Sequence, residues 1–91
     1  MEIEFSPEFH KRYSKANVRI QNKTKEVLQL FKNNPKNPQL DNHRLEREWT
    51  GYRSININAD WRAIYKEIII EEETIAYFVA IGTHDKLYSK N

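Results

Sequence analysis

Apolar and polar residues alternate with two different periods along this chain, helical in the first half and strand-like in the second. The first five residues place Met1, Ile3 and Phe5 against Glu2 and Glu4. A period of two is typical of a half-buried strand, so residues 1–5 are predicted to form one.

The segment "SPEF" after this strand is a helix-start signal. Ser6 can cap the first turn, and Pro7 suits the first helical position because its missing N–H would be unpaired there anyway. Glu8 complements the positive end of the helix dipole. The apolar face of this helix would consist of Phe9, Tyr13 and Ala16.

A second helix is predicted after a break at residues 16–17, and the proline-containing "NNPKNP" segment would end it. Apolar and small residues recur in it at helical spacing. They are Ile20, Thr24, Val27, Leu28 and Phe31. The two amphipathic helices are expected to form a hairpin with one joint apolar face.

From Gly51 onward the period changes to that of strands. In "YRSININ", Ile55 and Ile57 point to one side, and Tyr52, Ser54 and Asn56 point to the other. "NAD" can turn the chain into "WRAIYKEIII", and "EEE" can turn it into "TIAYFVAIG". Successive strands joined by short turns form a meander, which is antiparallel.

This order of elements predicts a single α+β domain over residues 1–91. We expect two N-terminal helices packed on one face of a curved, mainly antiparallel four-strand sheet. The other face would stay partly open and carry tyrosines, arginines and polar residues.

Composition narrows the function classes. The chain has no cysteine, which excludes disulfides and thiolate metal sites. It begins with acidic residues rather than a basic segment and an apolar run, so a cytoplasmic location is expected. Its longest apolar stretches are too short to cross a bilayer, and no membrane role is expected.

Charge gives a weaker signal. The formal net charge is +2, too small to predict strong sequence-independent binding of nucleic acid. Cations are nevertheless concentrated between residues 44 and 66. They are Arg44, Arg47, Arg53, Arg62 and Lys66. Arginine is well suited to bidentate phosphate contact, but scattered surface charge is an equally good reading of this segment.

Three residues able to exchange protons stand out, each with an ordinary structural explanation. His43 lies in the polar segment "LDNHRLE", where a histidine is more often solvated than catalytic. Asp60 suits the turn "NAD" for local hydrogen-bonding reasons. His84 follows a predicted strand in "IGTHDKLY", where rigid scaffolds often present reactive groups. No close ligand spacing among these residues supports a metal site.

Two longer segments carry a resemblance to a known family. "HRLEREWTGYRSININADWRAIYK" and "IGTHDKLY" resemble the RelE/ParE superfamily of bacterial toxins from type II toxin-antitoxin modules, and most closely its YafQ-like branch. The resemblance rests on a histidine before "L-x-x-x-W-x-G-Y-R", the aspartate of "DWR-x-I-Y-K", and "GTH-x-x-L-aromatic". These three features occur in order, and the similarity covers nearly the whole chain.

The resemblance implies a ribosome-dependent endoribonuclease that cuts messenger RNA and is neutralised by a partner antitoxin. His43, Asp60, His84 and Tyr88 match the family's catalytic positions, and Arg53 matches the arginine of "GYR". In one departure, Asn56 stands where YafQ-like proteins often carry another active-site histidine. Neither a cofactor nor a metal is implied.

These residue types suit metal-free RNA cleavage. The ribose 2′-hydroxyl attacks phosphorus, which requires a base, an acid at the leaving oxygen and cations around the phosphate. We expect His84 to be the acid, with Asp60 and His43 sharing the base and orienting roles. RNA and phosphate contacts are assigned to Arg53, Arg62 and Asn56. Tyr88 could stack on a base or lend its hydroxyl to the phosphate.

Two other functions stay open at this point. The ParE branch of the superfamily inhibits DNA gyrase, although that branch is not expected to combine the aspartate with both histidines. A catalytically weakened relative with Asn56 could still bind its antitoxin and repress a shared operon. Apolar surface beyond what two helices can cover would favour an added helix or strand from such a partner.

Overall fold

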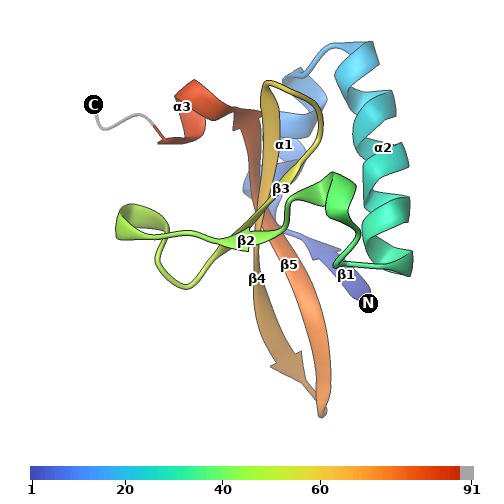
Figure 1. Ribbon diagram of the computed structural model, residues 1–91, viewed down its shortest axis with the longest axis vertical. Helices are drawn as coiled ribbons and strands as arrows, with labels where there is room; N and C mark the ends of the chain where they lie inside the picture. The colour runs from blue at the N-terminus through green and yellow to red at the C-terminus, as the bar shows by residue number, and fades with distance from the viewer. Residues whose placement is uncertain (89–91) are drawn as a thin grey trace.

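Two helices lie against one face of a single sheet in this computed structural model, which describes residues 1–88 (Figure 1). In chain order the elements are β1 (Glu2–Phe5), α1 (Pro7–Lys15), α2 (Val18–Asn33), η1 (Pro38–Leu40), β2 (His43–Arg44), η2 (Arg47–Trp49), β3 (Arg53–Asn56), β4 (Trp61–Ile70), β5 (Glu73–Thr83) and α3 (His84–Tyr88), with η marking a short 3-10 helix. The predicted α+β class is confirmed.

The strand order within residues 1–88 is β1-β5-β4-β3-β2. Only β1 is parallel to its neighbour, β5, and the other pairs are antiparallel, as the meander predicts. The expected strand number was one too low, because His43 and Arg44 pair with Ser54 and Arg53 as β2. A strand of two residues is too short for its alternation to show in the sequence.

Both helices begin where side chains can cap them. The Ser6 hydroxyl accepts a hydrogen bond from the Phe9 N–H at 3.0 Å, and the Asn17 side chain accepts one from the Ile20 N–H at 3.0 Å. Caps of this kind satisfy backbone donors that have no partner within the helix. The predicted helix starts and the break at Ala16 are therefore confirmed.

The main core fills the space between the helices and the sheet. Phe31 of α2 contacts Tyr65 and Phe78 edge-on, at ring-centroid distances of 5.0 and 5.4 Å. Ile55 and Ile57 lie on this side of β3, as their alternation predicts. Edge-on aromatic packing adds to the energy of apolar burial, so this cluster fixes the helices on the sheet.

A β-bulge in β5 changes which residues face the helices. Tyr65 pairs with Phe78 but Ile64 pairs with Ala80, so Val79 has no partner in β4. Phe78 and Ile81 therefore both belong to the helix-side core, whereas Ala80 lies on the opposite side. The bulge shifts the last part of β5 by one residue and reverses its faces.

The opposite face of the sheet carries a second, smaller apolar cluster. Its buried residues are Ile64, Ala80 and Leu87, and Leu45, Trp49, Tyr52, Val79 and Tyr88 pack around them. The indole N–H of Trp49 donates to the carbonyl of Leu87 at 2.9 Å and so joins η2 to α3. This face is thus only partly open, and its uncovered part forms the hollow described below.

The end of the chain differs from the sequence-based expectation. The sequence pattern predicts no element after the last strand, but residues 84–88 form the helix α3. Thr83 accepts a hydrogen bond from the Lys86 N–H at 3.3 Å at its start. The Leu87 side chain of this helix packs over Gly82, where a Cβ would lie 3.4 Å from it.

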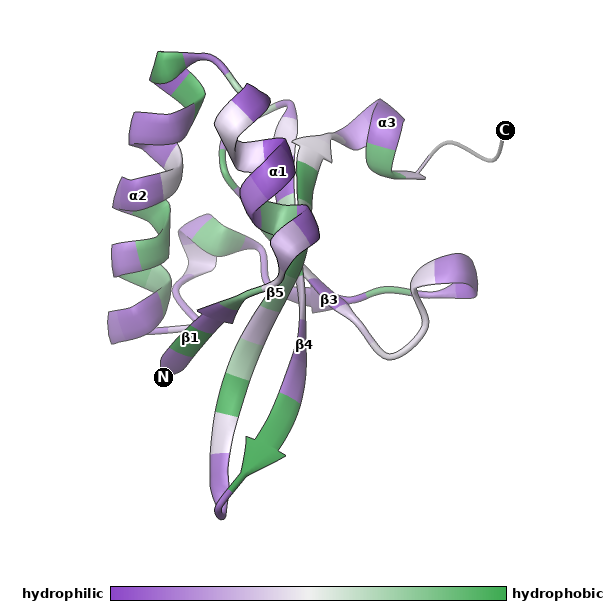
Figure 2. Ribbon diagram, turned by 180° about the vertical axis from the view of Figure 1, so that it is seen from behind, coloured by the Kyte–Doolittle hydropathy of each residue, from purple (hydrophilic) through white to green (hydrophobic). Residues whose placement is uncertain are grey.

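The long β4–β5 hairpin extends away from the helices, and the apolar end of β4 is visible near its tip (Figure 2). Ile69 and Ile70 are 75% and 48% exposed there. Over residues 1–88, no helix has the length and apolar character needed to cross a membrane.

The buried hydroxyl of Tyr65 makes the free energy of unfolding decrease at alkaline pH. Burial raises the pKa of Tyr65 above its ordinary value of 10.0, and the hydrogen bond from Asn42 opposes the shift only in part. Because Tyr65 holds its proton more tightly in the folded protein, its phenol favours the fold fully below the pKa of the unfolded state. This contribution is lost as pH rises through the higher pKa of the folded state.

We therefore predict that the free energy of unfolding, measured by urea denaturation, falls above about pH 10. Tyr65→Phe has no group to ionise at this position, so it should lose less stability over the same pH range. Equal losses in both proteins would contradict this assignment.

Candidate functional site

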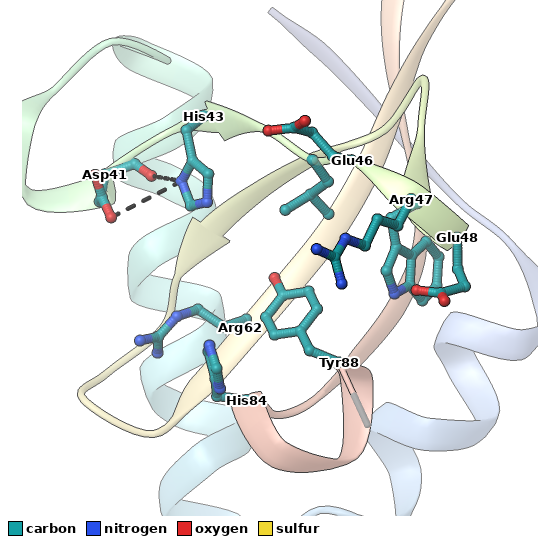
Figure 3. A pocket seen from close by; sticks show the side chains of 10 residues that line it. Asp41, His43, Glu46, Arg47, Glu48, Arg62, His84 and Tyr88 are labelled. Carbon is teal, nitrogen blue, oxygen red and sulfur yellow. Dashed lines mark hydrogen bonds and ion pairs between the residues drawn. The ribbon is translucent and has the colours of Figure 1, made fainter. Parts of the chain in front are cut away.

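A hollow of about 490 Å³ lies on the face of the sheet that the helices leave free (Figure 3). It is bounded by the segment from β2 to η2 on one side and by β4 and α3 on the other. Its lining residues are Asp41, His43, Leu45, Glu46, Arg47, Glu48, Trp49, Arg62, His84 and Tyr88. Four residues singled out in the sequence therefore meet here.

His84 is the first residue of α3, and its backbone is fixed from the β3–β4 turn. The His84 N–H donates to the carbonyl of Asp60 at 2.7 Å. The His84 ring meets the Tyr88 ring edge-on, with centroids 4.6 Å apart. Its Nδ1 lies 3.8 Å from the Asp85 carboxylate, and 56% of the side chain is exposed. The imidazole is thus oriented by its neighbours but accessible to a ligand.

His43 approaches the hollow from the opposite wall. Its Nδ1 lies 2.7 Å from the backbone carbonyl of Asp41 and 3.8 Å from the Asp41 carboxylate. A carbonyl can only accept, so Nδ1 carries the proton in this hydrogen bond. The lone pair is then on Nε2, which points away from Asp41 and toward the hollow (Figure 3). A neutral imidazole held this way can accept a proton from a ligand.

Tyr88 and Arg62 lie between the two histidines in the wall of the hollow. The Tyr88 hydroxyl donates to the Ser54 hydroxyl at 2.8 Å. Nη1 of Arg62 lies 2.8 to 3.2 Å from three backbone carbonyls, those of Asn58 and Ala59 in the β3–β4 turn and that of Trp61 at the start of β4. These contacts hold the guanidinium beside His84 (Figure 3).

Arg47 is a lining residue that the sequence analysis did not assign to the site. Its guanidinium extends across the hollow toward Tyr88 (Figure 3). Arg47 has a left-handed backbone, with φ at 60°, which turns η2 over the second apolar cluster. Its place in the cationic segment was visible in the sequence, but nothing there showed that it faces the histidines.

Three of the predicted site residues do not contribute side chains to this hollow. Arg53 lies on the helix-facing side, where its Nε donates to the Asn42 side chain at 2.9 Å. Asn56 lines a different hollow beside α2, and its side-chain oxygen is buried without a hydrogen-bond partner among residues 1–88. The Asp60 side chain is exposed in a turn, and only its carbonyl contacts His84.

Strand alternation is the physical reason for the position of Arg53. Arg53 pairs with Tyr65, and Ser54 pairs with His43, so neighbouring residues of β3 face opposite sides of the sheet. The side chain of Arg53 therefore points away from the two histidines, so this geometry gives no support to its predicted phosphate contact, which stays a prediction. Alternation does not separate Asn56, which pairs with Arg62 and shares its face of the sheet. Asn56 lies at the end of β3 among the residues that line the hollow beside α2, and not among those that line the hollow with the histidines.

The chemistry available in the hollow is proton transfer beside an anion. Two imidazoles lie on opposite walls, a phenol lies between them, and Arg47 and Arg62 supply positive charge. Within the described chain no group of three or more histidine, aspartate or glutamate side chains could hold a metal ion. The arrangement suits acid–base chemistry on a substrate that carries phosphate.

Comparison with known proteins places the chain in a family. Residues 1–89 match the family described as bacterial toxin of type II toxin-antitoxin system, YafQ. Among the curated proteins, none is similar enough in sequence to count as a match.

Solved structures agree with the family match. YafQ from E. coli strain BL21(DE3) is 32% identical, with 97% of this chain and 98% of that chain covered and a TM-score of 0.76. The toxin in the E. coli DinJ–YafQ complex is also 32% identical over 97% of this chain and 98% of that chain, with a TM-score of 0.73.

A YoeB/ParE toxin from Agrobacterium tumefaciens shares the fold at 18% identity, with 92% of this chain and 99% of that chain covered and a TM-score of 0.71. The family match spans nearly the entire sequence, and its fold is the one described above. The chain therefore belongs to the YafQ family of toxins from type II toxin-antitoxin systems.

Proposed function

We propose that this toxin is a ribosome-dependent endoribonuclease that cleaves messenger RNA by acid–base catalysis between His43 and His84. The observation that carries the proposal is the convergence of these two imidazoles on one hollow, although they are far apart in the sequence. Arg62 and Tyr88, which the sequence also singled out, line the same hollow.

In the proposed reaction, Nε2 of His43 removes the proton from a ribose 2′-hydroxyl. The resulting oxygen attacks the adjacent phosphorus, and the bond from phosphorus to the 5′-oxygen of the next nucleotide breaks. The His84 imidazolium gives its proton to that leaving oxygen. The products are a 2′,3′-cyclic phosphate and a free 5′-hydroxyl, and each histidine ends in the other's starting protonation state.

The remaining residues have supporting roles in this proposal. Arg62 and Arg47 stabilise the negative charge that develops on the phosphoryl oxygens. Tyr88 orients the His84 ring by edge-on contact and offers its own ring to a base. Asp60 acts through its backbone carbonyl, which fixes the start of α3, rather than through its carboxylate.

Dependence on the ribosome is consistent with the electrostatics of the chain. The net charge is only +2, and three carboxylates, those of Asp41, Glu46 and Glu48, line the hollow with the two arginines. The protein by itself should therefore attract RNA weakly. A ribosome that holds the messenger in place would supply the positioning that the open hollow lacks. This role would place the toxin in the cytoplasm.

We also propose that a cognate antitoxin binds this chain, because an E. coli relative of 32% identity was crystallised in a complex named DinJ–YafQ. The exposed apolar side chains of Val18, Ile69 and Ile70 offer surface that a partner could cover.

Replacing the proposed acid should remove cleavage. His84→Ala is expected to lower the rate of ribosome-programmed mRNA cleavage by roughly 10²–10⁴-fold and to abolish growth inhibition. His10→Ala is a matched control, since His10 lies exposed on α1, and it should cleave normally. Undiminished cleavage by His84→Ala would contradict the assignment of His84 as the acid. Loss of DNA supercoiling in place of mRNA cleavage would favour gyrase inhibition instead.

Arg62 provides an independent test of the phosphate role. Arg62→Gln is expected to lower kcat by about 10²-fold with little change in the folded structure, because one cationic donor near the phosphate is removed. Arg19→Gln, which removes an exposed arginine from α2, should leave kcat unchanged. Equal rates for the two variants in the same cleavage assay would show that Arg62 does not act on the phosphate.

A further inference from the structure

Asn42 uses its whole side-chain amide in hydrogen bonds, although it lies in a short loop before β2. Its Nδ2 donates to the carbonyl of Pro35 at 3.0 Å and to the Tyr65 hydroxyl at 2.9 Å. Its Oδ1 accepts from Nε of Arg53 at 2.9 Å. Arginine can only donate and a backbone carbonyl can only accept, so these partners fix the orientation of the amide.

This cluster of Asn42, Arg53 and Tyr65 is anchored in the main core. Tyr65 is 1% exposed, and its ring centroid lies 5.0 Å from those of Phe31 and Phe78. Arg53 lies directly opposite Tyr65 in the β3–β4 ladder. If the Asn42 side chain moved, the Tyr65 hydroxyl and the Arg53 Nε would each lose a hydrogen-bond partner, which costs free energy where the group is buried.

The residues on either side of Asn42 belong to the hollow on the other face of the sheet. Asp41 precedes it with a left-handed backbone, at φ 46° and ψ 47°. His43 follows it and pairs with Ser54, whose hydroxyl accepts from Tyr88. The short hydrogen bond from Nδ1 of His43 to the Asp41 carbonyl therefore spans the one residue that the cluster holds.

We propose that Arg53, Asn42 and Tyr65 are positioning residues: from the far side of the sheet they hold the Asp41 carbonyl against Nδ1 of His43, and so keep the Nε2 lone pair directed into the hollow. Arg53 thus acts through Asn42 rather than on the RNA phosphate. The inference rests on the proposed function only for its catalytic consequence, because the tautomer of His43 can be measured without any substrate.

The left-handed conformation of Asp41 is what gives the cluster its importance. Aspartate adopts positive φ more readily than most non-glycine residues, so neighbouring contacts decide whether it keeps this conformation; here the Asp41 N–H donates to the Pro38 carbonyl at 3.2 Å, and the Asn42 amide holds the next residue. Without the amide contacts of Asn42, the loop is free to relax to ordinary backbone angles, and the Asp41 carbonyl then turns away from the ring. His43 is 49% exposed at its side chain, so water would replace the lost partner and the Nδ1–H tautomer would lose its preference.

The test compares two arginines that face each other across the β2–β3 ladder, Arg44 and Arg53. Arg53→Met removes the donor to Asn42, and Arg44→Met removes the same charge from an exposed side chain that lies outside both the cluster and the hollow. Asn42→Ala removes the whole anchor. Tyr65→Phe keeps the ring in the core and removes only the hydroxyl acceptor, so it serves if the other variants fold poorly.

The first readout is the ¹⁵N chemical shifts of the His43 ring, recorded at a pH where the imidazole is neutral. We expect the Nδ1–H tautomer in the wild-type protein and in Arg44→Met, and a shift toward Nε2–H in Asn42→Ala, Arg53→Met and Tyr65→Phe. An unchanged tautomer in every folded variant, or Nε2–H in the wild-type protein, would overturn the inference.

The second readout is ribosome-programmed cleavage. Outer contacts that orient a functional histidine typically contribute about 10–100-fold, so we expect kcat to fall by that factor in the cluster variants with KM unchanged. A tautomer change together with no cleavage by the wild-type protein would reject the proposed function and leave the positioning role standing. A tautomer change with normal kcat would overturn the catalytic part of the inference.

Discussion

The arrangement of both faces of the sheet depends on the bulge at Val79. Because one residue of β5 has no partner in β4, Phe78 and Ile81 can both pack under the helices, while Ala80 and Gly82 lie on the opposite face. Ser6 stabilises this point: its N–H donates to the Phe78 carbonyl at 2.9 Å, and its hydroxyl donates to the Val79 carbonyl at 3.4 Å. The same serine caps α1, so the first helix and the bulge are fixed together.

The hollow is a consequence of this packing. After the bulge, β5 leads into α3 on the face that the N-terminal helices leave free. There Leu87 is part of the second apolar cluster, and the Trp49 indole N–H donates to the Leu87 carbonyl. His84 and Tyr88 are then presented by a helix held at several points. His43 lies on β2 in the opposite wall. The preceding residue, Asn42, joins this strand to the main core through its hydrogen bonds with Tyr65 and Arg53. Rigid elements thus hold both histidines, and the space between them stays open.

The sequence predicted the parts of this protein whose causes are local. Ser6 and Pro7 mark the start of α1, and the alternation of Ile55 and Ile57 identifies the buried side of β3. The pairing of His43 in β2 and the helix at His84 have no such local signal, because a two-residue strand and a five-residue helix exist only through their partners. The sequence could not distinguish Arg53 from Arg47, because both are arginines in one cationic segment. Arg53 lies on the face of β3 away from the hollow, whereas the left-handed backbone at Arg47 places that residue in the hollow lining.

The central claim is that the two histidines cleave RNA by transferring protons around a 2′-hydroxyl attack, and the chemical ends of the cleaved messenger test it most directly. Ribosomes programmed with a defined mRNA would be incubated with the purified toxin, and the 3′ end of the upstream fragment would be identified. We predict a 2′,3′-cyclic phosphate, or the phosphate formed by its hydrolysis, together with a 5′-hydroxyl on the downstream fragment. A 3′-hydroxyl end, or an intact messenger, would contradict it.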